Sequence, residues 1–300
     1  MTALIHAGEL AAMGTALLWT LSALAWTTSG KHIGALAVSF IRLAITSVFL
    51  LAYGQVFRGL CLPTDATAET WLLMGVSGFV GFFLADVCLF KALLVIGPRL
   101  TLLLQALTPP MTAVISWVWL GDGLGVKDGL AMMVTLSGVT WVVLERPNGR
   151  HAAHDRRRLR QGVVLGVLAA AGQALGMVIA KEGIGDYDAA AATFIRVLGA
   201  MVGYIVSISL IRRWRAIITA TRRGRTMAII TFGSFVGPFL GVVLLMIALR
   251  HCHAGVAATI ISTTPVWILP FVVILYREKV SLRAVGGAVL SVVGVALLVL

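Results

Sequence analysis

The chain has 300 residues, of which 59% are hydrophobic and only 12% are charged. A soluble domain carries about 25% charged residues, so this composition excludes an ordinary soluble protein and indicates a membrane protein. The net charge of +12 does not indicate nucleic-acid binding, because the basic residues lie in short gaps between apolar stretches, which is the pattern that sets membrane orientation.

Ten apolar stretches are long enough to cross a bilayer as helices. Most gaps between them are short, so neighbouring spans are expected to form antiparallel hairpins. The longest polar gap, residues 145–160, separates an expected unit 1–144 from a second unit 161–300. The fold class is therefore predicted to be all-α integral membrane. The ten expected spans are residues 9–30, 34–57, 71–91, 98–120, 126–144, 161–182, 188–211, 226–249, 254–276 and 281–300.

The two units are weak copies of each other. GFVGFFL at residues 78–84 aligns with SFVGPFL at 234–240, and LTPP at 107–110 aligns with TTPV at 263–266; 234 − 78 and 263 − 107 both give 156. SFIRL at 39–43 likewise matches TFIRV at 193–197. Because five is an odd number of spans, the second copy must enter the membrane upside down. Inverted repeats of this kind are typical of transporters with a substrate path between the halves.

Basic residues predict the orientation. Loops on the side of the N-terminus hold four of them, whereas loops on the opposite side hold 18, including six arginines in 145–160 and six in 212–225. Positive loops remain in the cytoplasm. Both termini are therefore expected in the periplasm, and the loops 145–160 and 212–225 in the cytoplasm.

Prolines interrupt two repeat-equivalent spans. Each proline removes an intrahelical hydrogen bond and bends its helix, and the threonine before it offers a hydroxyl to a freed carbonyl. Equivalent bends predict hinges or gates, with a purely static shape as the alternative. The candidates are Thr108, Pro109 and Pro110 in the fourth span, and Thr264, Pro265 and Pro270 in the ninth.

With these features the chain resembles the drug/metabolite transporter superfamily of the EamA type. The resemblance rests on ten helices in two five-helix repeats, an aromatic/Arg motif in the second and seventh spans, and a TP motif in the fourth and ninth. A finer likeness is to the YddG-type amino acid exporters of bacterial inner membranes. The resemblance covers essentially the whole chain. It implies a basket of spans 1, 3, 4, 6, 8 and 9 around a central cavity, with spans 5 and 10 at the periphery.

Charged residues inside spans cost about 2.5–3.5 kcal/mol near a helix centre. Arg42 and Asp86 lie about 12 Å and 8 Å from the inner ends of their spans, so we expect them to pair. Arg196 is the repeat equivalent of Arg42, whereas Val242 stands where a second Asp86 would be. We expect Arg196 near the outside, within reach of an acidic residue there: Glu182, Asp186 or Asp188. Three roles are open for these charged residues. They can neutralise one another for structural reasons, Asp86 can serve as a gate or proton site, or an arginine can capture a substrate carboxylate.

Aromatic and polar side chains in the spans are candidates for the cavity wall. Apolar walls with few polar groups suit an amphipathic solute, although any single member has an alternative place in the core or against lipid. The candidates are Trp19, Ser22, Phe79, Phe82, Phe83, Gln105, Gln173, Phe235, Phe239 and Trp267.

The predicted function is a secondary transporter of small metabolites, exporting neutral or aromatic amino acids across the bacterial inner membrane by alternating access. The alternatives are a proton-coupled exporter of drugs or organic cations and, in another class, an intramembrane lipid-modifying enzyme. No cofactor is expected, and no metal, since His251–His253 lacks further ligands. No Walker motif occurs, so ATP-driven pumping by this chain alone is not expected. The expected partners are the substrate and the bilayer, without nucleic acid, for a monomer or alternatively a homodimer.

Overall fold

A computed structural model of the chain describes residues 2–33, 35–144, 156–264, 266–267 and 282–299. These residues are helical and joined by short turns, with no strand among them. The first repeat contains α1 (Thr2–Ile33), α2 (Ala35–Tyr53), the π-helix η1 (Gly54–Arg58), α3 (Ala68–Gly78), the π-helix η2 (Phe79–Leu84), α4 (Ala85–Gln105), α5 (Thr108–Leu120) and α6 (Val126–Leu144).

The second repeat follows the same order, except that it adds one short helix and its described residues show no counterpart of η1. It contains α7 (Arg156–Ile184), α8 (Ala189–Leu210), α9 (Trp214–Thr221), α10 (Gly224–Ser234), the π-helix η3 (Phe235–Gly241), α11 (Val242–His251), α12 (Ala254–Ile261) and α14 (Leu282–Val299). The short helix α9 lies in the basic segment 212–225, where the sequence predicts only a loop, and Trp214 in it packs edge-to-face on Phe40 of α2 at 5.5 Å. The expected ninth span continues past α12 into residues outside the described part.

Six segments among the described residues are long and apolar enough to cross a membrane: His6–Ala25, Leu36–Arg58, Ala68–Ile96, Arg157–Ile184, Ala189–Leu210 and Gly224–His251. They correspond to the expected spans 1, 2, 3, 6, 7 and 8. The fourth and ninth spans are interrupted, as their prolines predict, at Ala106–Leu107 and Ser262–Thr263. Helices α6 and α14, of 19 and 18 residues, occupy the fifth and tenth positions. Eight of the ten expected positions are therefore occupied by continuous helical segments among the described residues, and the fourth and ninth are interrupted.

The turn between the third and fourth spans lies inside α4, although the sequence predicts a loop there. A Cβ on Gly162 of α7 would lie 2.1 Å from Ile96, and one on Gly166 would lie 2.5 Å from Leu104. A straight helix would carry Leu104 about 12 Å beyond Ile96, away from α7. Because both residues contact neighbouring turns of α7, the chain must reverse direction between them.

Helices α6 and α14 show directly how the repeats are related. A Cβ on Gly138 would lie 2.4 Å from the Ser291 nitrogen, and one on Gly294 would lie 2.5 Å from the Thr135 nitrogen. Gly138 and Gly294 are 156 residues apart (294 − 138), and so are Thr135 and Ser291 (291 − 135). Two helices in which each residue contacts the equivalent of the other's partner are related by a two-fold axis. The partner number falls as the α6 number rises, so these equivalent helices are antiparallel and the repeats are inverted.

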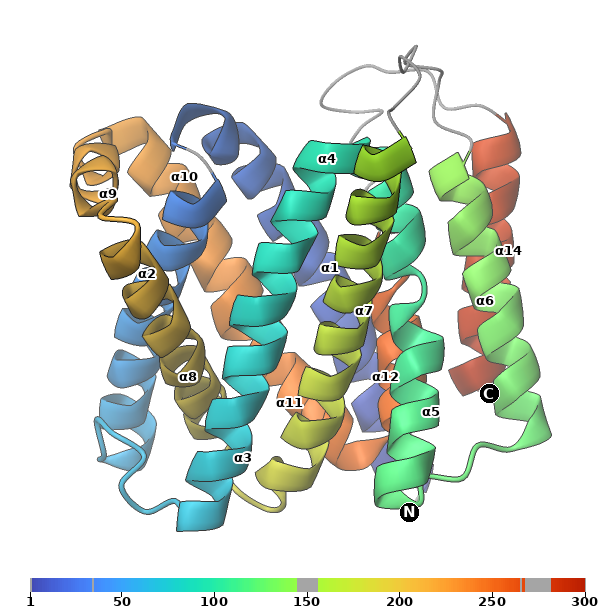
Figure 1. The fold of residues 1–300 in the computed structure, drawn as a ribbon. Helices are drawn as coiled ribbons and strands as arrows, with labels where there is room; N and C mark the ends of the chain where they lie inside the picture. The colour runs from blue at the N-terminus through green and yellow to red at the C-terminus, as the bar shows by residue number, and fades with distance from the viewer. Residues whose placement is uncertain (1, 34, 145–155, 265, 268–281, 300) are drawn as a thin grey trace.

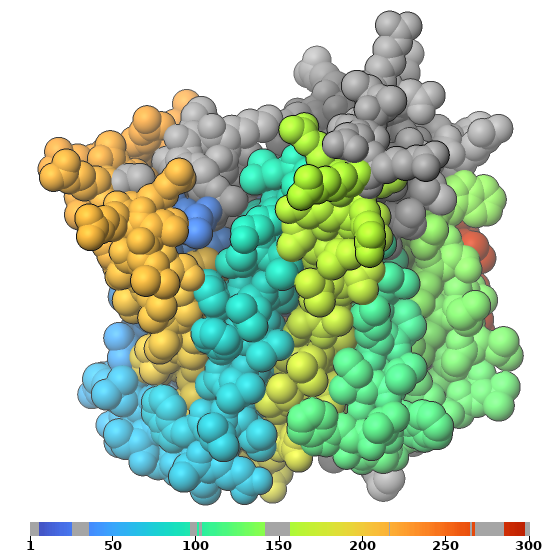
Figure 2. All heavy atoms as spheres, viewed as in Figure 1, coloured from blue at the N-terminus to red at the C-terminus, as the bar shows by residue number. Residues whose placement is uncertain are grey.

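Figure 1 shows α6 and α14 side by side at one edge of the bundle, and α2, α8, α9 and α10 toward the other edge. Both termini lie toward the lower end of this view, whereas α9 lies at the upper end. Figure 2 shows the atoms of α7 filling the face between α4 and α5. The peripheral place of α6 and α14 agrees with the expectation for spans 5 and 10.

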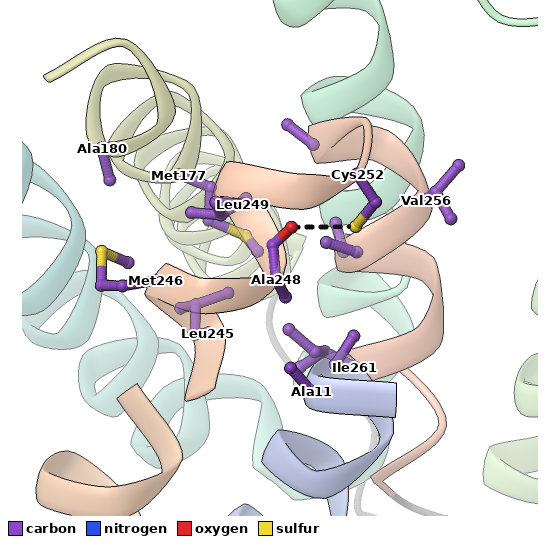
Figure 3. Packing of buried hydrophobic residues seen from close by; sticks show 14 of the residues in the cluster. Ala11, Met177, Ala180, Leu245, Met246, Ala248, Leu249, Cys252, Val256 and Ile261 are labelled. Atoms are coloured by element: carbon purple, nitrogen blue, oxygen red, sulfur yellow. Dashed lines mark hydrogen bonds between the residues drawn. The ribbon is translucent and has the colours of Figure 1, made fainter. Parts of the chain in front are cut away.

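A core cluster joins the two repeats near the end where α11 turns into α12. It contains Ala11 of α1, Met177 of α7, Leu245 of α11 and Ile261 of α12, with Ala11 beside Ile261 (Figure 3). The thiol of Cys252 in that turn donates a hydrogen bond of 3.0 Å to the Ala248 carbonyl. These apolar contacts join the two repeats at this end of the bundle.

Candidate functional site

Two π-helices lie at equivalent positions in the repeats, η2 in the third span and η3 in the eighth. They coincide with the FVGFFL and FVGPFL motifs. Single π-turns inside longer helices are found frequently at functional sites, and they leave carbonyls without an ordinary i→i+4 partner. Thr15 of α1 donates to the Gly241 carbonyl of η3 at 3.1 Å, and Tyr204 of α8 donates to the Phe82 carbonyl of η2 at 3.3 Å. Each π-helix is therefore held by a side chain from a neighbouring helix.

Trp19 lies where the first repeat meets η3. A Cβ on Gly241 would lie 2.8 Å from the Trp19 ring, so only glycine leaves room for the indole. Ser22, fully buried, donates to the Trp19 carbonyl at 3.0 Å and is engaged within its own helix. Gln173, the repeat equivalent of Trp19, is partly buried on α7, next to the point where Gly172 packs on Ala85. Trp19 thus makes one contact between the repeats, with Gly241, and Gln173 lies next to the equivalent contact of Gly172 with Ala85.

The two helix interruptions share one hydrogen-bond pattern. The backbone N–H of Leu107 donates to the Leu104 carbonyl at 3.1 Å, and the backbone N–H of Thr263 donates to the Ile260 carbonyl at 3.2 Å. Thr264 serves a freed carbonyl as expected, donating to Ile261 at 2.7 Å. Thr108 differs, because its hydroxyl contacts the Gln105 side chain at 3.4 Å.

Other polar groups gather at these interruptions. The buried Gln105 amide nitrogen has no hydrogen-bond partner among the described residues. Trp267 donates its indole N–H to the Thr263 hydroxyl at 3.1 Å, and Thr20 of α1 donates to the Thr264 carbonyl at 3.3 Å. Pro109 and Pro110 begin α5, whereas Pro265 and Pro270 lie outside the described residues.

Four of the candidate phenylalanines form two repeat-equivalent pairs, one more exposed and one packed against a neighbouring span. Phe79 and Phe235 are 37% and 40% exposed. Phe83 packs edge-to-face on Tyr204 of α8 at 5.0 Å, and Phe239 packs on Phe49 of α2 at 5.8 Å. These side chains fill equivalent interfaces, span 3 with span 7 and span 8 with span 2.

Arg42 and Asp86 form a buried ion pair between α2 and α4, as their expected depths indicate. Each residue is 9% exposed. Asp86 is therefore already engaged by an arginine of its own repeat.

Arg196 does not meet the acidic residues expected for it. Asp188 instead caps α8 by accepting from the Ala191 N–H at 2.8 Å, and no described carboxylate forms an ion pair with Arg196. The guanidinium carbon of Arg196 lies 4.4 Å from the centre of the Phe82 ring. The expected pairing near the outside is wrong, because the side chain turns into the bundle toward η2.

Polar contacts join the repeats at the end that holds the termini. Lys181 of α7 pairs with Asp122, which follows α5 and also accepts from Ser116 at 2.6 Å. Tyr187 donates to Asp65 at 2.8 Å. A further contact joins Arg58 Nε to Asp188 Oδ1 at 3.7 Å. We call these residues the terminal-side network: Arg58, Asp65, Asp122, Lys181, Tyr187 and Asp188.

Sequence reasoning missed this network and two buried features. Glu9 in the first span is only 4% exposed and contacts His6 at 3.1 Å, although the sequence singles out Asp86 alone as an embedded carboxylate. Pro238 lies inside η3. Pro238 could have been found from its place in the SFVGPFL motif. Glu9 lies at the edge of an expected span, and no sequence feature singles it out.

Replacing Asp122 with asparagine is expected to lower the free energy of unfolding by about 1–2 kcal/mol, since a partly buried, charge-assisted hydrogen bond is lost. Thermal unfolding of purified protein measures this. Glu69→Gln is the matched control, because Glu69 is exposed at the start of α3 and its loss should change little. Equal effects of the two variants would contradict a role for the network.

The pH dependence of this contribution follows from the pKa of Asp122. Burial acts against its charge, but hydrogen bonds from Lys181 and Ser116 outweigh burial and hold the pKa below 3.8. A lowered pKa means that the stabilisation is present above pH 3.8 and is lost as the pH falls through the lower value. Burial and the bond to Asp65 raise the pKa of Tyr187 to about 12. From pH 5 to 8 both groups keep their charge states.

Comparison with known proteins supports the two-repeat arrangement. The sequence model described as "EamA-like transporter family" matches residues 6–144 and 160–300. A search of the curated proteins finds no relative that matches. One solved structure, described only as "Crystal structure of protein", is similar with a TM-score of 0.77 over 97% of this chain and 95% of the other, at 18% identity. That likeness concerns the fold alone.

Proposed function

The chain belongs to the EamA-like transporter family and is therefore a multi-pass membrane transporter of small molecules, and from this premise we propose that it exports neutral or aromatic amino acids. Its membrane would be the bacterial inner membrane, with both termini in the periplasm. The two inverted repeats would rock about a site at their interface, which is the usual way in which inverted repeats give alternating access.

The observation that carries the amino acid assignment is the ion pair of Asp86 with Arg42. An exporter of organic cations needs a free carboxylate in its central path, because a bare cation is costly in a low-dielectric interior. Asp86 is neutralised within the protein, and Glu9 contacts His6 near one end of the first span. The described part of the spans thus favours a substrate without net positive charge.

The interface between the repeats supports the place of the site. Trp19 contacts Gly241 at the end of η3, Gln173 lies next to the equivalent contact of Gly172 with Ala85, and Gln105 adds an amide at the break of the fourth span. The terminal-side network joins the repeats at one end only. Its rupture would open that end, which is the periplasmic end in the proposed orientation.

Flux into proteoliposomes tests this proposal. We expect labelled neutral or aromatic amino acids to exchange across the vesicle membrane, and to do so without an imposed pH gradient, since Asp86 is held by Arg42. The panel includes an organic cation as competitor substrate, and empty liposomes provide the blank. Flux of the cation with no flux of any amino acid would overturn the substrate assignment.

A further inference from the structure

Arg196 is a fully buried guanidinium to which no described residue supplies an anion. It is 1% exposed, and its Nε has no hydrogen-bond partner among the described residues. The guanidinium contacts two polarisable groups: Nη1 lies 3.8 Å from the Met246 sulfur, and the guanidinium carbon lies over the Phe82 ring. Sulfur is a weak acceptor, so the charge is poorly compensated.

The other repeat shows what is missing. Arg42, the equivalent of Arg196, meets the carboxylate of Asp86 on the neighbouring span. Adding 156 to 86 gives 242, where the second repeat has a buried valine. The protein thus supplies the carboxylate in one repeat and an apolar group in the other. The three carboxylates outside the described residues, Glu145, Asp155 and Glu278, belong by sequence to the polar segments between spans.

An uncompensated buried charge is strongly destabilising, so a ligand that neutralises it gains the corresponding free energy. The planar guanidinium presents a fork of N–H donors that matches a carboxylate in bidentate geometry. Phe82 and Met246 flank the guanidinium with apolar surface. A small organic carboxylate with an apolar group fits both features.

The position of Arg196 relates it to the opening of the bundle. Arg196 lies seven residues after Ala189, about 10 Å from the end of α8 that Asp188 caps. Asp188 and its contact to Arg58 belong to the terminal-side network. Rupture of that network would open the path from this end toward Arg196.

We propose that Arg196 binds the carboxylate of the transported solute, in the place that Asp86 fills for Arg42. This assignment rests on the proposed transport function and deepens it, since it makes the carboxylate the group that the protein recognises. The amino acid then supplies the anion that the second repeat lacks. Phe82 and Met246 contact the apolar part of the solute.

Thermal unfolding of the purified protein with two matched probes tests the proposal. The probes are 3-phenylpropanoate and its neutral isostere 3-phenylpropanamide. Ligands that bind the folded state raise its stability by mass action. We expect the carboxylate to stabilise the wild-type protein with a half-saturating concentration at least tenfold lower than that of the amide. Because this measurement needs no flux, it is independent of the transport assay.

Three variants complete the test. Arg196→Met is expected to be more stable than the wild type without ligand, since it removes an uncompensated charge, and to respond equally to both probes. Arg196→Lys should retain a weaker preference for the carboxylate, and Arg215→Met, which removes an exposed arginine of α9, should retain the full preference. An Arg196→Met protein that fails to fold, or that still prefers the carboxylate, overturns the proposal, and so does a wild type that does not distinguish the probes.

Flux separates this proposal from the broader one. If the wild type transports amino acids but does not prefer the carboxylate probe, the transport function stands and the role of Arg196 falls. If the carboxylate binds through Arg196 but no amino acid crosses the membrane, the binding site stands and the amino acid assignment falls.

Discussion

Replacing Gly78 with alanine is expected to prevent stable folding. A Cβ at this position would lie 1.8 Å from the carbonyl oxygen of Arg196 and 2.5 Å from its carbonyl carbon. Both atoms belong to the backbone of α8, so relief requires α3 and α8 to separate along their contact. Overpacking a core typically costs about 1–3 kcal/mol, and a backbone-to-backbone clash should exceed that range. The yield of monodisperse protein and its thermal midpoint measure the effect.

Gly75→Ala is the matched control, because Gly75 lies one turn earlier in the same helix and a Cβ there would meet nothing within 4 Å. Glycine inside a helix is less stable than alanine by about 0.5–1 kcal/mol. This control should therefore fold as well as the wild type or better. Similar losses in both variants would show that the α3–α8 contact is looser than described.

Removing one member of the Arg42–Asp86 pair is expected to cost about 3–5 kcal/mol, because it leaves the other member buried without its counter-charge. Asp86→Asn and Arg42→Met are the two single variants. The double variant Arg42→Met with Asp86→Leu should recover most of the loss, since apolar replacement of a buried pair is often neutral or stabilising. Thermal unfolding of all four proteins gives the coupling between the two sites.

Flux by the double variant decides what the pair does. A folded double variant that exchanges amino acids at the wild-type rate identifies structural neutralisation. A folded double variant without flux identifies a gate or a proton site at Asp86. Stable single variants, with no coupling between the sites, would remove the pair from any account of the fold.

The Arg42–Asp86 pair was predictable because it depends on depth alone. Charged residues in a bilayer interior are rare and usually pair with one another, so two opposite charges at similar depth on neighbouring spans are expected to pair. The inverted relation of the repeats was predictable for a similar reason, since an odd number of spans fixes the direction of the second copy. The structure confirms it through the reciprocal contacts of Gly138 and Gly294.

The sequence does not predict which aromatic side chains are exposed and which are buried. In a membrane the lipid is as apolar as the protein core, so the sequence of a span does not distinguish a side that faces lipid from one that packs. Phe79 therefore looks like Phe83 in sequence, yet Phe79 is exposed and Phe83 is buried against Tyr204. Arg196 was misplaced because depth was taken to choose its partner, whereas the direction of the side chain toward η2 decides its contacts.

The paired π-helices bear on the ancestry of the chain. A π-turn holds one more residue than an α-turn and arises from a single inserted residue in a helix. η2 begins at Phe79 and η3 begins at Phe235, and 235 − 79 gives the same 156 that relates the motifs. Two independent insertions at one alignment column are far less economical than one. A single insertion before duplication of a five-span unit accounts for both π-helices.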